Sequence, residues 1–167
     1  MAVRFLLDTN TVSFYIRRSS PALERRLQRT LAADVALSVV TEMELRYGLA
    51  RNPRLRIAPL VEEFLAGTTI LPLTSEVARV YGRIRAELEV AGKPIGPLDL
   101  MIAAQAFALR ATLVTNNTKE FRRIRGLRCE DWTGGFLGTR PDGVPRNDRA
   151  GAEAPRNDRA GGRSPSE

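Results

Sequence analysis

Short, almost entirely apolar segments alternate with longer segments of helical periodicity along most of this chain. Four of the apolar segments predict strands and a fifth predicts an edge strand: 3–7, 35–38, 68–72 and 111–115, with the edge strand at 127–131. Strands that are apolar on both faces must be covered on both faces, which is typical of parallel strands joined by helices. We therefore predict an α/β fold, an α/β/α sandwich around a central parallel sheet of about four or five strands.

The connecting segments have the spacing of amphipathic helices, in which apolar residues recur every three or four positions. Helices are predicted at 10–18, 21–32, 41–50, within 54–66, at 75–91 and at 98–110. In 21–32 an apolar face is formed by Leu23, Leu27 and Leu31. In 75–91 it is formed by Val77, Val80, Tyr81, Ile84 and Leu88. Pro59 is expected to disturb the helix within 54–66.

Three counts limit the chemistry. The chain has no histidine, which excludes Ser-His-Asp and Cys-His catalysis and histidine-ligated zinc. A hydrolase of this composition would use carboxylates, with a hard metal such as Mg²⁺ or Mn²⁺. The net charge of +7 favours a polyanionic partner, most simply nucleic acid. The single cysteine, Cys129, excludes an intramolecular disulfide and favours a cytoplasmic location.

The region 138–167 differs in composition from the rest of the chain. Large apolar residues almost vanish there, and the segment PRNDRAG occurs at 145–151 and again at 155–161. Such a stretch cannot bury a core, so we predict a domain at 1–137 followed by a disordered tail. We favour a read-through or repeat-element extension without function, with an RNA- or protein-binding tail as the alternative.

Asp8 directly follows the first predicted strand. As a good N-cap residue it can cap the next helix, although Asn10 or Thr11 could do so equally well. A charge that ends an apolar run needs a partner, and a metal ion is one. Asp8 is therefore a candidate site residue.

Glu42 and Glu44 lie two residues apart on one predicted helix, so their side chains point in nearly opposite directions. Glu42 is expected to pair in solvent with Arg46, four residues further on. Glu44 is the site candidate of the two. Its alternative role is structural, because Thr41-x-x-Glu44 has the spacing of a capping box.

Asp99 follows Pro97, which suits the first position of a helix, and so falls in the first helical turn. The helix dipole favours an acid there, which is a structural explanation. However, its face continues through Ala103 and Ala106, small residues that indicate close packing. An acid on a packed face needs a partner, so Asp99 is also a candidate.

Asn117 and Glu120 follow the strand at 111–115, either as ordinary turn residues or as site residues. In a parallel sheet the carboxyl ends of the strands meet at one edge, and the following helices begin near it. The four candidate segments could therefore converge. Crowded carboxylates repel one another, and a divalent ion relieves the repulsion. A metal-holding acidic pocket on a basic body is what a metal-dependent nuclease requires.

Several motifs in this order resemble the PIN domain, and most closely the VapC ribonuclease toxins of bacterial toxin–antitoxin pairs: LLDTN, TEMELRYG, PIGPLDLMIAAQA, LVTNNTKEF and LRCEDW. The resemblance covers residues 3–133. It implies a magnesium-dependent endoribonuclease, with Mn²⁺ as a substitute ion, that hydrolyses phosphodiester bonds in structured RNA, often tRNA. It also implies a VapB-like antitoxin as partner, a homodimer, and contact with operator DNA only through the antitoxin.

By the same resemblance, Asp8, Glu44 and Asp99 correspond to the magnesium-binding acids of the family. At the fourth acidic place many PIN domains have an aspartate, whereas this chain has Asn117 and Glu120 in that neighbourhood. Either of these would complete the catalytic set. The number of ions bound at rest therefore stays open, and a second ion arriving with the substrate is one arrangement.

Basic side chains offer candidates for RNA contact. Solvated surface charge is the interpretation we favour for Arg46, Arg85, Lys93 and Lys119. Both interpretations stay open for a denser cluster, formed by Arg122, Arg123, Arg125 and Arg128. Tyr47 and Tyr81 are expected to be core residues rather than platforms for base stacking.

Other classes fit less well. A haloacid-dehalogenase type of phosphatase needs a second acid two positions after Asp8, where this chain has Asn10. A phospho-acceptor receiver domain needs an acid pair near its start, and Lys119 fits its lysine only loosely. The main alternative is a degenerate PIN module that binds RNA or a partner protein without cleavage, for which Asn117 leaves room.

Overall fold

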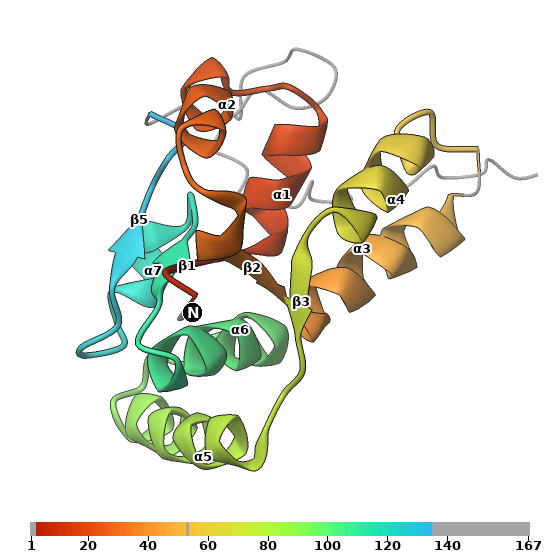
Figure 1. The fold of residues 1–167 in the computed structure, drawn as a ribbon. Coiled ribbons are helices and arrows are strands. Elements are labelled where there is room, and N and C mark those ends of the chain that lie inside the picture. Colours follow the sequence, from red (N-terminus) through yellow and green to blue (C-terminus); the bar gives the residue numbers. More distant parts are fainter. Residues whose placement is uncertain (1–2, 53, 135–167) are drawn as a thin grey trace, which may run out of the picture. The chain divides into compact units, whose positions relative to one another are not determined.

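The computed structural model describes residues 3–52 and 54–134, which form a parallel sheet flanked by helices (Figure 1). The strand order is β3-β2-β1-β4-β5. The strands are β1 (Phe5–Leu7), β2 (Val35–Ser38), β3 (Thr69–Leu71), β4 (Thr112–Val114) and β5 (Cys129–Glu130). Every neighbouring pair is parallel, with Leu7 in register with Leu37 on one side and Val114 on the other. The predicted α/β/α fold is confirmed, including the edge strand.

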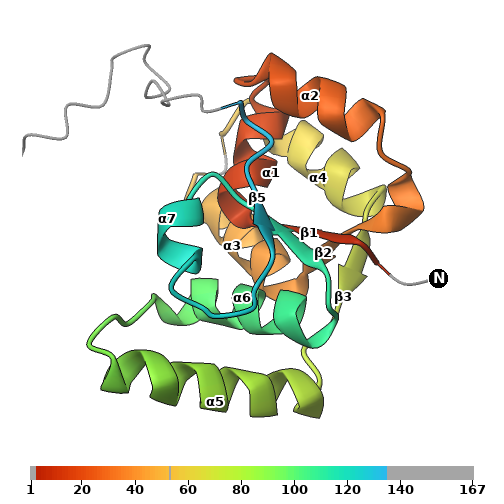
Figure 2. The same cartoon turned by 90° about the vertical axis from the view of Figure 1, so that its left-hand side faces the viewer.

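The helices cover both faces of this sheet. They are α1 (Thr9–Ile16), α2 (Pro21–Gln28), α3 (Val39–Arg51), α4 (Ala58–Ala66), α5 (Ser75–Val90), α6 (Pro97–Ala108) and α7 (Thr118–Phe121), with a short 3-10 helix at Ala32–Asp34. In Figure 2, α5 and α6 lie below the sheet, while α1, α2 and α4 lie above it.

Consecutive residues of β1 face opposite sides, as the strand period of two requires. Leu6 packs in the core that α5 and α6 cover, together with Ile84 and Ile102. Phe5 and Leu7 pack in the other core with α1 and α2. Because all of β1 is buried, its backbone is firmly placed, and so is Asp8 directly after it.

Two helix boundaries differ from the sequence prediction. The helix predicted at 21–32 ends at Gln28, so Leu31 lies beyond it and is 72% exposed, while Leu23 is fully buried. The helix predicted at 41–50 begins at Val39, because the Ser38 side chain accepts a hydrogen bond from the backbone N–H of Val40.

The capping-box interpretation of Thr41 and Glu44 is therefore wrong. Thr41 is buried inside α3, and its hydroxyl donates to the carbonyl of Leu7 at 3.5 Å. The expected disturbance at Pro59 is also absent, because the proline falls in the first turn of α4, where its missing N–H costs nothing.

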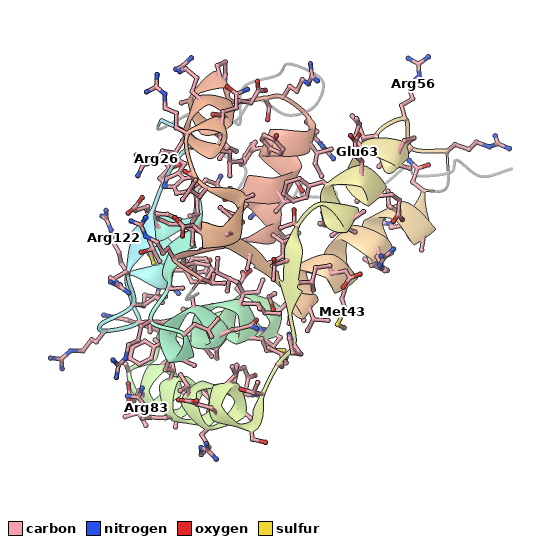
Figure 3. The ribbon with its side chains drawn as sticks, viewed as in Figure 1. Arg26, Met43, Arg56, Glu63, Arg83 and Arg122 are labelled. Carbon is pink, nitrogen blue, oxygen red and sulfur yellow. The ribbon has the colours of Figure 1, made fainter. Side chains whose placement is uncertain are left out.

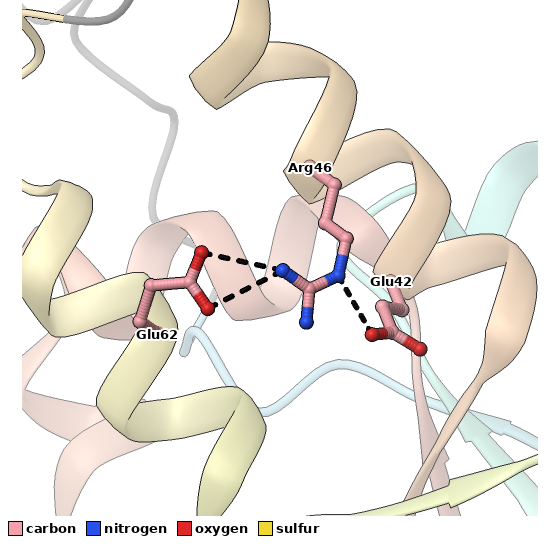
Figure 4. Close-up of polar contacts among 3 residues, drawn as sticks. All are labelled: Glu42, Arg46 and Glu62. Atoms are coloured by element: carbon pink, nitrogen blue, oxygen red, sulfur yellow. Dashed lines mark hydrogen bonds and ion pairs between the residues drawn. The ribbon is translucent and has the colours of Figure 1, made fainter.

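An ion-pair cluster joins α3 to α4 on the surface (Figure 4). Arg46 Nε donates to Glu42 Oε1 at 2.8 Å, and Arg46 Nη1 contacts both carboxylate oxygens of Glu62 at 3.3 Å. The predicted Glu42–Arg46 pair is confirmed. Arg46 has two carboxylate partners, which supports its interpretation as a structural surface charge over that of an RNA contact.

Within the described residues, no helix is both long enough and apolar enough to span a membrane. The predictions of a domain boundary after residue 137 and of a disordered tail at 138–167 lie outside the described residues.

Candidate functional site at the carboxyl edge of the sheet

Asp8 directly follows β1 and is the N-cap of α1. Its Oδ1 accepts a hydrogen bond from the backbone N–H of Thr11 at 2.6 Å, and its own N–H donates to the carbonyl of Val114 in β4 at 3.0 Å. The side chain is only 3% exposed. Burial raises the pKa of Asp8, the polar side chains of Thr11 and Thr115 oppose this shift, and the charge of Glu44 adds to it. Asp8 thus performs the capping role itself, while its carboxylate remains poorly solvated.

Glu44 reaches the same edge from the second turn of α3. Its Oε2 accepts a hydrogen bond from the hydroxyl of Thr9, the first residue of α1, at 2.5 Å. The contact crosses between two helices that follow neighbouring strands, which explains how Glu44 is brought beside Asp8. Glu42, two residues earlier, points to Arg46 instead, as the helical spacing predicts.

Asp99 lies in the first turn of α6, which begins at Pro97 as predicted. The side chain is half-buried, and the small residues Ala103 and Ala106 on its face are fully buried. Burial is the largest cause that raises the pKa of Asp99 to about 6, followed by the negative charges of Glu120, Glu44 and Asp8. Within the described part of the chain, no group donates a hydrogen bond to its carboxylate.

Asn117 and Glu120 lie at the start of α7, after β4. The Asn117 Nδ2 donates to Glu120 Oε2 at 2.5 Å, and the backbone N–H of Asn117 donates to the Thr115 hydroxyl at 2.9 Å. The Glu120 charge acts on Asp99. The two residues therefore form a unit, in which the amide orients the carboxylate.

The four carboxylates share one electrostatic neighbourhood, since the charges of the other three all raise the pKa of Asp99. They are not gathered around one point: across residues 3–52 and 54–134, no three Asp, Glu, Cys or His side chains are arranged to hold a metal ion. Glu44 is turned toward Thr9 and Glu120 toward Asn117. Both partners are neutral, so neither hydrogen bond removes the negative charge.

The donors fit a hard divalent cation. All four are carboxylates, and oxygen ligands are those that Mg²⁺ prefers. A cation among them would relieve the repulsion that opposes ionisation of Asp99 and would compensate the poorly solvated charge of Asp8.

A comparison with protein-family models matches residues 5–127 to the PIN domain. The chain belongs to the PIN-domain family. Within this family its similarity is to VapC proteins. The tRNA(fMet)-specific endonuclease VapC of Shigella flexneri is 40% identical over 133 residues, which are 78% of this chain and 99% of that protein. The ribonuclease VapC2 of Haemophilus influenzae is 38% identical over 132 residues, 78% of this chain and 98% of that protein.

Solved structures give the same assignment. The DNA-bound VapBC of Salmonella typhimurium matches with a TM-score of 0.73 and 38% identity, over 78% of this chain and 98% of that chain. VapBC2 of Rickettsia felis, bound to a DNA fragment from its promoter, matches with a TM-score of 0.71 and 34% identity. This PIN domain is therefore of the VapC type.

Sequence reasoning missed the hydroxyl groups that arrange the carboxylates of this PIN domain. Thr9 holds Glu44, and the Thr11 hydroxyl donates to the carbonyl of Val114 at 3.0 Å, which ties α1 to β4. Thr115 holds the backbone of Asn117. The only available signal was their position directly after predicted strands, which is also where ordinary turn residues occur.

The aromatic and basic candidates for RNA contact differ in their exposure and in their hydrogen-bond partners. Tyr47 is 67% exposed, so its predicted core role is wrong, whereas Tyr81 packs partly buried against the core. Arg85 donates to Glu89 at 2.8 Å and to the Tyr81 hydroxyl at 3.2 Å, which supports a structural surface role. Lys93 and Lys119 are exposed.

Proposed function

We propose that this protein is a magnesium-dependent endoribonuclease, the toxin of a toxin–antitoxin pair, which hydrolyses phosphodiester bonds in RNA, with tRNA as the substrate class. The observation that carries the proposal is the position of four acids, Asp8, Glu44, Asp99 and Glu120, near the starts of the helices at the carboxyl edge of the sheet, where the charges of the other three act on Asp99. The similarity to VapC endonucleases over nearly their whole length supports it.

Each acid has a proposed role. Asp8 and Asp99 would hold the main ion. Glu44 would hold a second ion or orient the attacking water, because its Oε2 is fixed by Thr9. Glu120 would complete the shell, and Asn117 would orient it through their hydrogen bond.

Asp8 and Asp99 would hold the Mg²⁺, which when bound would supply Lewis acidity toward the phosphodiester and toward the attacking water. The chain's own contribution is to position oxygen atoms. The cap at Thr11 holds one oxygen of Asp8, and the packed alanine face of α6 holds the backbone of Asp99. An acidic edge without a cation would repel a phosphate, so we expect the scissile phosphate to approach the carboxylates only when the ion is bound, while the rest of the RNA can be held elsewhere on the surface without it.

We also propose a VapB-like antitoxin as the partner, because the similar solved structures are VapBC complexes. Contact with operator DNA would run through that antitoxin. A homodimer and a cytoplasmic location belong to the same proposal.

The test is to incubate the purified full chain with a total tRNA pool, with Mg²⁺ or with EDTA, and to map new RNA ends. We expect defined new ends with Mg²⁺ only, and none with Asp99→Asn purified in the same way. Glu42→Gln is the matched control, because Glu42 lies on the same helix as Glu44 but pairs with Arg46.

RNA that is bound but never cut would favour the degenerate, non-cleaving module instead. Cleavage by Asp99→Asn at the wild-type rate would reveal a contaminating ribonuclease or a different active site, and would contradict the proposal.

A further inference from the structure

A run of exposed basic side chains begins at the candidate site. It consists of Lys119, Arg122, Arg123, Arg125 and Arg128, which we call the basic segment. All five side chains are exposed, and none forms an ion pair with an acid in residues 3–52 or 54–134. The segment starts in α7, the helix that carries Glu120 of the site.

Several other surface arginines are already paired with acids. Arg46, Arg83 and Arg85 each pair with a glutamate within their own helix. Such i,i+4 pairs are the usual state of charges on a solvated helix face. The basic segment has no such partners, so its positive charge remains available to an anion.

Buried apolar residues fix the basic segment to the core. Phe121 is 1% exposed and Ile124 is 4% exposed, and they alternate with the basic residues. Gly126 has φ +83°, a backbone conformation that favours glycine, and it turns the chain toward β5. The basic side chains therefore project from an ordered support and lose less freedom when they bind.

Two observations relate the basic segment to the carboxylates. Arg123 Nη1 donates to the carbonyl of Pro94 at 3.0 Å, which ties the segment to the loop that precedes α6 and Asp99. Burial is the main cause that raises the pKa of the Cys129 thiol in β5 to about 11, and two charges also act on this thiol: that of Arg122 lowers the pKa, whereas that of Asp8 raises it. Positive and negative groups thus lie within electrostatic reach of the same strand.

From this arrangement we propose that the basic segment binds the phosphate backbone of an RNA strand and leads it to the carboxylates. The proposal rests on the proposed ribonuclease function and adds the surface that holds the substrate. Contacts with phosphates do not depend on the base sequence. The basic segment would therefore supply affinity and orient the strand, while other groups would determine which phosphodiester bond is cut.

A second arginine group provides a matched control. Arg51, Arg54 and Arg56 lie at the end of α3 and in the connection to α4, are exposed, and form no ion pair with any described acid. Figure 3 shows Arg56 at the outer end of this connection, well separated from Arg122 beside β5. Neutralising either group removes the same charge from the chain.

The test compares Arg122→Gln/Arg125→Gln/Arg128→Gln with Arg51→Gln/Arg54→Gln/Arg56→Gln in the full chain. Binding of a fluorescent single-stranded RNA is measured by anisotropy in EDTA, where no cleavage is expected, over a series of salt concentrations. Arg123 and Lys119 are left intact, because Arg123 contacts Pro94 and Lys119 adjoins Glu120. Circular dichroism and Tm confirm that both variants are folded.

We expect the first variant to bind at least about tenfold more weakly at low salt, with a salt slope smaller by about 2, which corresponds to about three lost phosphate contacts on a single strand. The second variant should retain wild-type affinity. Equal weakening in both variants would mean that net charge alone attracts RNA, and would overturn the proposal.

Three further outcomes distinguish this inference from the proposed function and from binding of a protein partner. If Mg²⁺-dependent cleavage occurs but the first variant binds RNA like the wild type, the proposed function stands and the basic segment has no role in RNA binding. If the first variant keeps its RNA affinity but loses binding to poly-glutamate, the surface belongs to an acidic protein partner. If no RNA is cut but the first variant alone loses RNA affinity, the inference about the segment survives.

Discussion

The starts of α1 and α6 both place an aspartate at the carboxyl edge of the sheet, but in opposite conditions. Asp8 is buried, and one of its oxygens is committed to the cap of α1. Asp99 is half-buried, and nothing in the described chain donates a hydrogen bond to it. The comparison shows that a hydrogen bond within the fold holds the Asp8 carboxylate. The Asp99 carboxylate is positioned only through its backbone, and neighbouring negative charges oppose its ionisation.

Substitutions at Asp8 and at Asp99 should therefore have different effects. A change at Asp8 affects both the site and the helix that begins there. A change at Asp99 affects the site and relieves electrostatic repulsion. The predictions below use that contrast, beginning with the largest expected effect.

Asp8→Asn should lower Mg²⁺-dependent cleavage by roughly 10²–10⁴-fold, the range typical for loss of a group essential to catalysis. The amide is a poor ligand for a divalent ion, but its oxygen can still accept the hydrogen bond from Thr11. We therefore expect the Tm to stay near the wild-type value. Single-turnover cleavage and thermal unfolding measure the two effects, and a variant that is fully active would remove Asp8 from the site.

Asp99→Asn should stabilise the metal-free protein at neutral pH by about 1 kcal/mol, a figure reduced from the full shift because the side chain is half exposed to screening solvent. Burial, followed by the neighbouring negative charges, raises the pKa of Asp99 from its ordinary value of 3.8 to about 6 in the folded protein. The contribution of Asp99 to the free energy of unfolding is therefore complete below pH 3.8, its ordinary pKa, and is lost as the pH rises through its folded-state pKa of about 6.

The stabilisation by Asp99→Asn should therefore be present above about pH 7 and vanish near pH 4. Urea unfolding in EDTA at both pH values tests this. An equal gain at both would show that ionisation of Asp99 is not its cause.

Thr9→Val should reduce cleavage roughly fivefold, because a single hydrogen bond of about 1 kcal/mol to Glu44 is lost. The control is Thr30→Val. The hydroxyl of Thr30 lies on the surface and donates only to the carbonyl of Arg26, at 2.8 Å. Equal rates for Thr9→Val and the wild type would mean that Glu44 needs no support from α1.

Arg46→Gln should have the smallest effect. Its ion pairs with Glu42 and Glu62 are exposed, and such pairs contribute little to stability. We expect a slightly lower Tm and unchanged cleavage. If cleavage falls sharply while the Tm holds, Arg46 contacts RNA after all.

The sequence was sufficient to predict the sheet and the edge of the sheet near which the acids lie. Runs such as 35–38 and 111–115 are mostly apolar without alternation, which is typical of parallel strands that helices cover on both faces. The positions of Asp8 and Asp99 could be predicted, because Asp8 directly follows a strand and Asp99 comes two residues after the proline that begins a helix.

Details that depend on contacts distant in sequence could not be predicted in this way. Thr9 and Glu44 are separated by 35 positions, and only the packing of α3 beside α1 brings them together. Ser38 and Thr41 are both residue types that can cap the start of α3. Ser38 is the cap, because Thr41 is buried and its hydroxyl contacts the carbonyl of Leu7 in β1. Tyr47 shares the α3 face of Glu44, and its exposure reflects that nothing described in the chain covers it.

The central proposal is that the carboxylates of separate segments hold divalent metal at the edge of the sheet, and titration calorimetry with Mg²⁺ near pH 7.5 tests it most directly. The account predicts saturable binding to the wild type and to Glu42→Gln, and none to Asp99→Asn. Identical binding to all three, or binding to none, would contradict it.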